Sequence, residues 1–534
     1  MADHPVTKSC ERESSSFVDL LTFVDAIQSG ELDSAHAILF AWHTQSCDPD
    51  CSSLIPGLLG NRQHESRLLP LLQRWDRQKL VALGLDTVLD QLVQQLVPTA
   101  ISALAQIAPG YFVISGCRPS PTTVDVVVLS LEGKYYCRQI KGLRFKYSYN
   151  RHSEGLLGFN YSFIGILHLP RIQGVRAIWI NGTRVDSSHQ NLEGSSYIDQ
   201  IDDLLHLYRQ AEVPLDYFPE LIGGDFFALA SLLREPLRDV SQWSDWIHQD
   251  HRFGPPSSKE ARTTIVIPLF RLWHPFMQGH LAAFSMNPSF RHGDIELLYV
   301  IDDPSIEGQV LNWARVYLHD CPYPVRLISL RQNLGFGMAC NIGTYSSRTE
   351  RIILMNSDVM PFENGWFDAL DQYSNDYPTA LVSPVLLYDN YTIQHAGMHL
   401  GFSGASSSPV PCNLHPMKGL SLSQFLEKDP ISYQNNSFAL SGAVLAFDRN
   451  LFLSLGGFDP IFGRGDFEDL HLSLLWKKEH GDLLICRSAQ LMHLERQTMD
   501  TFVDDNRQWQ ERFNACCALH LNSDIQMLAT EWSS

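Results

Sequence analysis

The sequence lacks an excess of positive charge. It carries 40 Lys and Arg residues against 59 Asp and Glu residues, which gives a formal net charge of -19. A protein that binds nucleic acid through its phosphates needs a basic face, so this balance argues against a nucleic-acid partner. Small anionic ligands stay open, because a single site can be locally positive on an acidic protein.

Long apolar runs are missing too. No apolar stretch reaches the roughly 18–20 residues that a membrane span requires. The first residues, Met1 to Glu13, also lack the apolar core of a signal peptide. We therefore expect a cytoplasmic protein without a membrane span. Peripheral association with a membrane and assembly into a homo-oligomer both stay open.

The cysteines follow no disulfide or zinc pattern. There are 11 of them, an odd and scattered set, which favours reduced thiols. His43, Cys47 and Cys51 lie close together in the sequence. No second Cys/His pair completes the four ligands of a structural zinc site, so incidental buried thiols are the favoured interpretation.

What the sequence does contain is enough apolar material for several domains. The chain has 534 residues, 44% of them apolar and 19% charged, which is typical of a multidomain globular protein. Apolar residues at three- and four-residue steps predict a helical region over residues 1–109. Short β-type runs separated by turns such as Asn181-Gly182 predict a small β-sandwich-like module over residues 110–188. Residues 189–258 return to a helical pattern and end in a linker rich in Gly and Pro.

From residue 259 to the C-terminus, apolar strands alternate with helices. This pattern is typical of a Rossmann-like α/β domain with a mostly parallel sheet. The expected strands are Thr264–Leu269, Glu296–Ile301, Val325–Leu330, Ile352–Met355, Ala380–Leu387, Ala443–Phe447 and Leu483–Arg487. Open sheets of this kind place their ligands at the carboxyl ends of the strands.

Several polar residues follow these strands. Pro268 closes the first strand at the ligand edge, and Asp302 and Asp303 follow the second, where a carboxylate can bind a base or ribose. A helix cap is the alternative for these acids. The segment from Arg331 to Gly343 follows the third strand and begins a helix, so its glycines could expose N–H groups to a nucleotide. It is not a dinucleotide fingerprint, because Cys340 stands where the third glycine would be.

Two further clusters carry acidic residues. Asn356-Ser357-Asp358 ends the fourth strand, and Asp358 supplies the carboxylate oxygen that Mg²⁺ or Mn²⁺ prefers. The segment from Phe462 to Leu475 contains Glu468 and Asp469 at the start of a predicted helix, where one of them could act as a general base. A capping role for Asp358, and ordinary packing for His493, are the alternatives.

The ordered motifs V-I-P, V-I-D-D, N-L-G-F-G-M-A-C-N-I-G, L-M-N-S-D-V-M-P, S-G-A, G-G-F-D and F-E-D closely resemble those of family 2 glycosyltransferases with the GT-A fold. The rhamnosyltransferase-like branch is the most similar. The resemblance covers Thr263 to Glu495, less than half of the chain. It implies inverting transfer of a sugar from a nucleotide-diphosphate sugar, such as a UDP-, dTDP- or GDP-sugar.

The resemblance also implies roles for individual residues. Asp469 would be the general base, with Glu468 as the fallback, while Asp358 and His493 would hold a divalent metal, Mn²⁺ or Mg²⁺. The nucleotide sugar would be bound by a set of residues from the strand ends and the glycine-containing segments: Pro268, Asp302, Asp303, Asn333, Gly335, Asn341, Asn356, Ser441 and Gly442. Two departures from the family pattern are Asn356, in place of the first Asp of D-x-D, and His471, in place of the last acid of E-D-x-D.

The acceptor is expected to be a glycan or glycolipid in bacterial surface polysaccharide synthesis, by the same resemblance. A sugar-1-phosphate nucleotidyltransferase is one alternative, although the loop after the first strand has no glycine. A non-catalytic nucleotide-sugar-binding scaffold is another. The irregular segment from Ser403 to Phe438 could close over a substrate or be an inert insertion. Trp366 and Tyr391 could stack on sugars, but core packing is the favoured interpretation for each.

Overall fold

The computed structural model describes residues 100–210 and 226–533, apart from short interruptions. These are 109–110, 119–123, 131–134, 141–147, 152–156, 169–174, 181–182, 186–189, 192–196, 258–260, 292–294, 404–408, 429–437 and 495–506. The helical region predicted before residue 100 lies outside the described residues. The chain divides into two compact units, one formed by residues 1–193 and 207–213, the other by 194–206 and 214–534.

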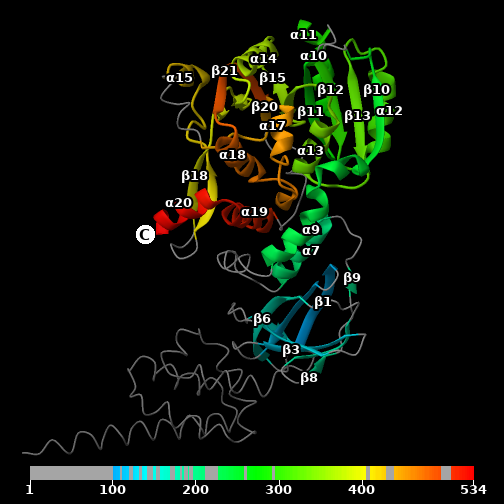
Figure 1. The fold of residues 1–534 in the computed structure, drawn as a ribbon, viewed down its shortest axis with the longest axis vertical. Coiled ribbons are helices and arrows are strands. Elements are labelled where there is room, and N and C mark those ends of the chain that lie inside the picture. Colours follow the sequence, from blue (N-terminus) through cyan, green and yellow to red (C-terminus); the bar gives the residue numbers. More distant parts are fainter. Residues whose placement is uncertain are drawn as a thin grey trace, which may run out of the picture. The chain divides into compact units, whose positions relative to one another are not determined.

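The first unit contains two mainly antiparallel sheets (Figure 1). The strands predicted for this module are present. The segment Ala100–Ala108, predicted as helix, is instead strand β1, which pairs with β2. Its alternation of apolar and small residues suits a strand inside a sheet. One sheet contains β5 (Ser148–Arg151), β6 (Leu157–His168), β2 (Tyr111–Arg118), β1 and β9 (Gln190–Asn191), and the other contains β4 (Tyr135–Ile140), β3 (Val124–Ser130), β7 (Val175–Ile180) and β8 (Thr183–Val185).

The second unit is built on a ten-stranded mixed sheet. All seven predicted strands are present in it. The order of its strands is β10 (Ile247–Phe253), β13 (Val325–Leu330), β12 (Ile295–Ile301), β11 (Thr263–Leu269), β14 (Arg351–Met355), β20 (Val444–Asp448), β16 (Leu381–Leu387), β21 (Leu483–His493) and β15 (Val359–Pro361), with β17 (Ile393–His395) beside β16.

The direction of the strands determines where their carboxyl ends meet. Strands β13, β12, β11 and β14 are parallel, and β20 is antiparallel to both β14 and β16. Strand β16 therefore points the same way as β14, and β21 is parallel to β16. The end of β21 at His493 consequently lies at the same edge of the sheet as the end of β14.

Strand β10 corrects the predicted domain boundary. Residues 247–253 were assigned to the helical region and linker, but they pair antiparallel with β13 as an edge strand of the main sheet. Their burial alternates along the strand, as expected for an edge strand with one covered face. The main sheet therefore includes residues that precede position 259.

Helices cover both faces of the sheet. Side chains from α10 (His274–Met286), α12 (Glu307–Tyr317) and α14 (Trp366–Asp376) share one apolar cluster with Ile265 and Leu297. The alternate residue, Val266, faces α13 (Phe336–Ser346) on the opposite side. A Cβ atom on Gly343 would lie 2.4 Å from Val266 Cγ1, so α13 can approach the sheet this closely only through a glycine.

The other helices and one further hairpin complete the description. They are α7 (Tyr197–Gln210), α9 (Phe227–Arg238), η3 (Val240–Trp246), α11 (Pro288–Arg291), the hairpin β18 (His399–Ser403) and β19 (Val410–Leu414), α15 (Leu422–Leu426), α17 (Arg449–Ser454), η4 (Pro460–Phe462), α18 (Glu468–Glu479), α19 (Arg507–Leu521) and α20 (Ser523–Ser533). None of the helices in the described part of the chain is long and apolar enough to span a bilayer.

Candidate active site

Three of the predicted motifs are joined by hydrogen bonds at one edge of the sheet. Met355 pairs with Val444 at the end of β14, and Asn356 N–H donates to Ala443 O at 2.8 Å. The neighbouring Gly442 N–H donates to Asp469 Oδ2 at 2.9 Å. The N-S-D segment and the predicted base are therefore linked through the S-G-A segment.

Asp358 and His493 lie close to each other. Val359 pairs with His493 between β15 and β21, and Leu494 N–H donates to Asp358 O. His493 Nε2 is 3.3 Å from Asp358 Oδ1, and both side chains are largely buried. The β15–β21 pairing, which the sequence pattern did not predict, brings the two side chains to one place.

Gln394 in β17 orients the His493 ring. Gln394 Nε2 donates to His493 O, so the Oε1 atom of the amide must be the one that faces Nδ1, at 2.6 Å. An amide oxygen only accepts, which places the ring hydrogen on Nδ1. His493 therefore turns Nε2 toward Asp358, either as a second N–H or as a lone pair available to a cation.

These residues suit a divalent cation that is shared with a ligand. Among the described residues no three His, Cys, Asp or Glu side chains are grouped to hold a metal ion by themselves. Asp358 and His493 offer one oxygen and one nitrogen, held in place by Gln394. Mg²⁺ is commonly bound through one or two carboxylates together with substrate phosphates, so this small donor set fits such an ion.

The loop before the predicted base has an unusual backbone. Gly463, Gly465, Asp466 and Phe467 all have positive φ, from 55° to 127°. Phe467 is the N-cap of α18, and its side chain makes no capping hydrogen bond. The helix then begins with Glu468 and Asp469, whose charges are favourable at a helix N-terminus.

The environments of these two acids differ. Asp469 Oδ2 accepts from Gly442 N–H and Oδ1 accepts from Leu470 N–H. Burial raises the pKa of Asp469 to about 6, although these two N–H groups favour the ionised form. Burial and then the Asp469 charge raise the pKa of Glu468 well above its usual value. Asp469 is therefore the acid of the pair that loses its proton first.

Two buried polar atoms near these motifs lack a hydrogen-bond partner within the described part of the chain. Asn356 Oδ1 and Glu468 Oε2 are buried and find no hydrogen-bond partner among the described residues. A buried polar atom without a partner is costly, typically by about 1–3 kcal/mol. Groups of this kind are expected where a ligand completes the hydrogen bonds.

Asp302 and Asp303 have different surroundings. The Asp302 side chain is buried and accepts from Leu334 N–H at 2.8 Å and Gly335 N–H at 3.0 Å. Burial raises its pKa to about 7. Both oxygens are engaged with the backbone, so the predicted nucleotide contact of Asp302 is not supported. Asp303 accepts from Ser305 in a turn and is partly exposed, and its nucleotide contact stays a prediction.

The segment that begins α13 also bonds to other parts of the protein. Gly335 N–H donates to Asp302 and to Asn333 Oδ1, so its expected exposure to a nucleotide is wrong. A Cβ atom on Gly335 would lie 2.1 Å from Gly463 O. The backbone of Gly335 therefore closely approaches the loop that precedes Asp469. Asn333 is half-buried, and a ligand contact by this residue remains a prediction.

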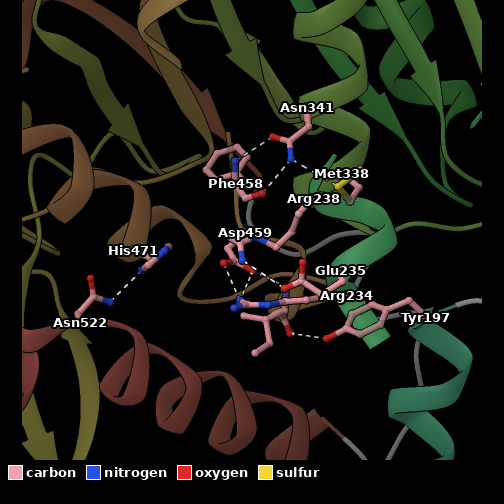
Figure 2. A network of polar contacts seen from close by, with 11 residues as sticks. Tyr197, Arg234, Glu235, Arg238, Met338, Asn341, Phe458, Asp459, His471 and Asn522 are labelled. Atoms are coloured by element: carbon pink, nitrogen blue, oxygen red, sulfur yellow. Dashed lines mark hydrogen bonds and ion pairs between the residues drawn. The ribbon is translucent and has the colours of Figure 1, made fainter. Parts of the chain in front are cut away.

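Asn341 is fully buried and pairs with the backbone of the G-G-F-D motif. Its Nδ2 donates to Phe458 O at 2.8 Å, and Phe458 N–H donates to its Oδ1 at 2.9 Å (Figure 2). The prediction that Asn341 lines a nucleotide pocket is therefore wrong. The local signal of an Asn after a glycine-rich turn could not distinguish a ligand contact from this clamp.

The other predicted residues lie as follows. Pro268 is partly exposed at the penultimate position of β11. Ser441 N–H donates to His395 Nε2 at 3.3 Å. His471 is buried and bonds Asn522 (Figure 2), so the position expected to carry a secondary acid packs against the C-terminal helices. Trp366 lies in the core, as favoured. Tyr391 is 55% exposed and therefore does not lie in the core.

Comparisons with known proteins find distant likenesses. No family model matches the sequence. The uncharacterized protein y4gI of Sinorhizobium fredii is 25% identical over 183 residues, which are 34% of this chain and 19% of that protein. This chain therefore matches less than a fifth of the length of that relative.

Solved structures with similar parts include GalNAc-T7 with UDP, GalNAc and Mn²⁺, which is 15% identical with a TM-score of 0.34 over 44% of each chain. The mannosyltransferase PcManGT from Pyrobaculum calidifontis, in complex with GDP-Man and Mn²⁺, is 13% identical with a TM-score of 0.31 over 60% of this chain and 85% of that one. TarS of S. aureus is 11% identical with a TM-score of 0.32 over 49% of this chain and 40% of that one. At these values the likenesses establish neither the fold nor the activity of this chain.

Proposed function

We propose that the second unit has the GT-A type of α/β fold and is an inverting glycosyltransferase. It moves a hexosyl group from a nucleotide-diphosphate sugar to a hydroxyl group of an acceptor. One observation carries the proposal: Asp469 is bonded to Gly442, whose neighbour Ala443 is bonded to Asn356, two residues before the Asp358–His493 pair. An acid with a raised pKa and a donor set suited to a divalent cation therefore lie on adjoining segments.

The reaction follows from the state of each group. Asp469, ionised at neutral pH, accepts the proton of the acceptor hydroxyl as that oxygen attacks the anomeric carbon. The bond from this carbon to the diphosphate breaks, and the nucleoside diphosphate leaves with the bonding electrons. Asp358 and His493 would hold Mn²⁺ or Mg²⁺, which when bound neutralises charge on the diphosphate. Asn356 Oδ1 and Glu468 Oε2 are left to bind substrate hydroxyls.

A donor screen tests this function. Purified protein is incubated with UDP-, dTDP- and GDP-sugars and Mn²⁺, and thermal shift identifies the donor, because a ligand that binds the folded state raises its apparent stability. The identified donor is then combined with glycan and glycolipid acceptors, including bacterial surface glycans, and we expect release of nucleoside diphosphate. Pyrophosphate release from a nucleoside triphosphate and a sugar 1-phosphate would instead identify a nucleotidyltransferase. A donor that binds but is never consumed would identify a scaffold.

The pH dependence of transfer gives a second test. Because the base must be ionised, kcat/KM is expected to rise with pH and level off above an apparent pKa near 6, the value that burial gives Asp469. The rising part of this profile, its acid limb, reports the titration of Glu468 and Asp469 together, because the two neighbouring acids influence each other. A flat profile between pH 5 and about 8 would contradict Asp469 as the base.

The contribution of Asp469 to the stability of the protein should fall as pH rises, whereas kcat/KM should rise. The folded pKa of Asp469, about 6, lies above the ordinary value of 3.8, so the folded state binds more protons than the unfolded chain between these values. The free energy of unfolding contributed by this group is therefore greatest below its unfolded pKa and declines as pH rises through its folded pKa. Urea titrations across this pH range measure the free energy of unfolding separately from kcat/KM, so the two opposite pH dependences can be compared.

A further inference from the structure

The loop that leads into Glu468 and Asp469 contains two residues with a strained backbone. Asp466 has φ of 74° and Phe467 has φ of 72°, in the left-handed region that L-residues with a side chain avoid. In this region the Cβ atom of such a residue lies too close to the backbone, which destabilises the conformation. Strained backbone of this kind persists only where surrounding groups determine it.

Asn514 in α19 supplies such a group. This residue is fully buried, and its Nδ2 atom lies within hydrogen-bond distance of three loop carbonyls: those of Phe462 at 2.9 Å, Gly465 at 2.5 Å and Asp466 at 3.0 Å. The three oxygens share the two hydrogens of one amide group. Gln510, one turn earlier in α19, donates to Asn514 Oδ1 and fixes the orientation of the amide.

Other contacts to this region come from helices that precede the sheet in sequence. Tyr197 OH in α7 donates to Ile461 O, and Arg234 in α9 pairs with Asp459 at 2.6 Å (Figure 2). Arg464 is paired with Asp202 of α7. These groups hold the start of the loop and one of its side chains. Asn514 bonds the carbonyls of Gly465 and Asp466 themselves, at the strained turn into α18.

We propose that Asn514 is a positioning residue for the general base. By gathering the carbonyls of Phe462, Gly465 and Asp466 around one amide, it holds the turn that directs Asp469 toward Gly442 and the acceptor. The proposal rests on the proposed function, since positioning has a catalytic effect only if Asp469 accepts a proton. The anchoring contact itself does not depend on the reaction.

Asn514→Ala removes the amide while leaving the two acids in place. Asn522→Ala is the matched control, because Asn522 is also a buried Asn of the C-terminal helices, and it bonds His471 and Ala518 rather than the loop. Hydrogen exchange, monitored by mass spectrometry, should rise in the peptide 462–470 for Asn514→Ala only. In the same variant we expect kcat to fall by about 10²-fold, because a displacement of about 1 Å at a catalytic group has that effect.

The pattern of kinetic changes distinguishes positioning from a general loss of structure. In Asn514→Ala the donor Kd with Mn²⁺, which depends on Asp358 and His493, should stay near the wild-type value. The acid limb of the kcat profile should move, because the N–H donors of Asp469 are displaced with the turn. Equal losses of kcat in both variants, or a wild-type kcat and acid limb in Asn514→Ala, would overturn the proposal.

Failure of the proposed function would be visible separately. If the wild-type protein transfers no sugar from any donor, the glycosyltransferase assignment fails and positioning loses its catalytic meaning. The exchange experiment still tests the anchor under those conditions. Unchanged exchange of the 462–470 peptide in Asn514→Ala would show that Asn514 does not hold the turn.

Discussion

Asp469→Asn is expected to lower kcat by about 10²–10⁴-fold, the usual contribution of a general base. The substitution keeps the size of the side chain but removes the group that can accept the proton. Donor binding should be retained, because Asp358 and His493 lie on other segments. The measurement is steady-state transfer together with donor affinity by calorimetry in the presence of Mn²⁺.

This substitution has a structural cost that must be separated from the chemical one. Asp469 accepts from two backbone N–H groups, those of Gly442 and Leu470, and an Asn side chain has only one oxygen. One hydrogen bond should therefore be lost, at a cost of about 1–3 kcal/mol in unfolding free energy. Urea unfolding of the variant shows whether enough stability remains for the kinetics to be interpreted.

Glu468→Gln is the matched variant for the neighbouring acid. Burial and then the Asp469 charge raise the pKa of Glu468 well above its usual value. This favours the protonated form of Glu468, which a glutamine amide resembles in shape. We expect a smaller loss of kcat in Glu468→Gln, with the acid limb near pH 6 still present. A larger loss than in Asp469→Asn, with the limb abolished, would exchange the roles of the two residues.

Asp358→Ala should weaken metal-dependent binding of the donor by at least about 10²-fold, since even groups that only orient a metal ligand contribute 10–100-fold. The variant removes the carboxylate oxygen 3.3 Å from His493 Nε2 and leaves one protein donor for the cation. Calorimetric titration of the donor with Mn²⁺, and again with EDTA, measures the difference. Donor affinity that is unchanged by both the substitution and EDTA would contradict the metal assignment.

A graded control comes from Gln394→Ala, which leaves both proposed ligands in place. Without the Oε1 acceptor, the ring hydrogen of His493 is no longer held on Nδ1. We expect an intermediate weakening of Mn²⁺ binding, about 10–100-fold. Asp371→Ala is a comparison on another surface, because this carboxylate accepts from Thr263 and Asn375, away from β15. It should bind donor and metal as the wild-type protein does.

Some of the site could be predicted because its residues are local to the ends of strands. The apolar run before Asn356 determines a buried strand, and the polar residues after it must emerge at the carboxyl edge. From the sequence, His493 could be paired with Asp358 only through the resemblance to family 2 glycosyltransferases. Its own sequence context contains no sign of the β15–β21 pairing that brings the two side chains together.

Other polar residues could not be interpreted from sequence, because one local pattern is compatible with two surroundings. Asn341 and Asp302 have the residue types and spacing of ligand contacts, yet their polar atoms are engaged with Phe458, Leu334 and Gly335. A short sequence records that a polar group needs a partner, but not whether that partner is a ligand or a distant backbone. Strand β1 was missed for a related reason, since short apolar runs suit a helix as well as a strand.

The sequence by itself determined the alternation of strands and helices after residue 259 and the positions of Asn356, Asp358, Glu468 and Asp469 at the ends of those elements. Only the tertiary structure decided which acids bond to distant backbone groups, how Gln394 orients His493, and that Asn514 bonds the carbonyls of the turn before Asp469. The physical reason is that periodicity and capping act over a few residues. Burial, pKa values and hydrogen-bond partners depend on groups that lie far apart in the sequence, such as Asn341 and Phe458, which are 117 positions apart.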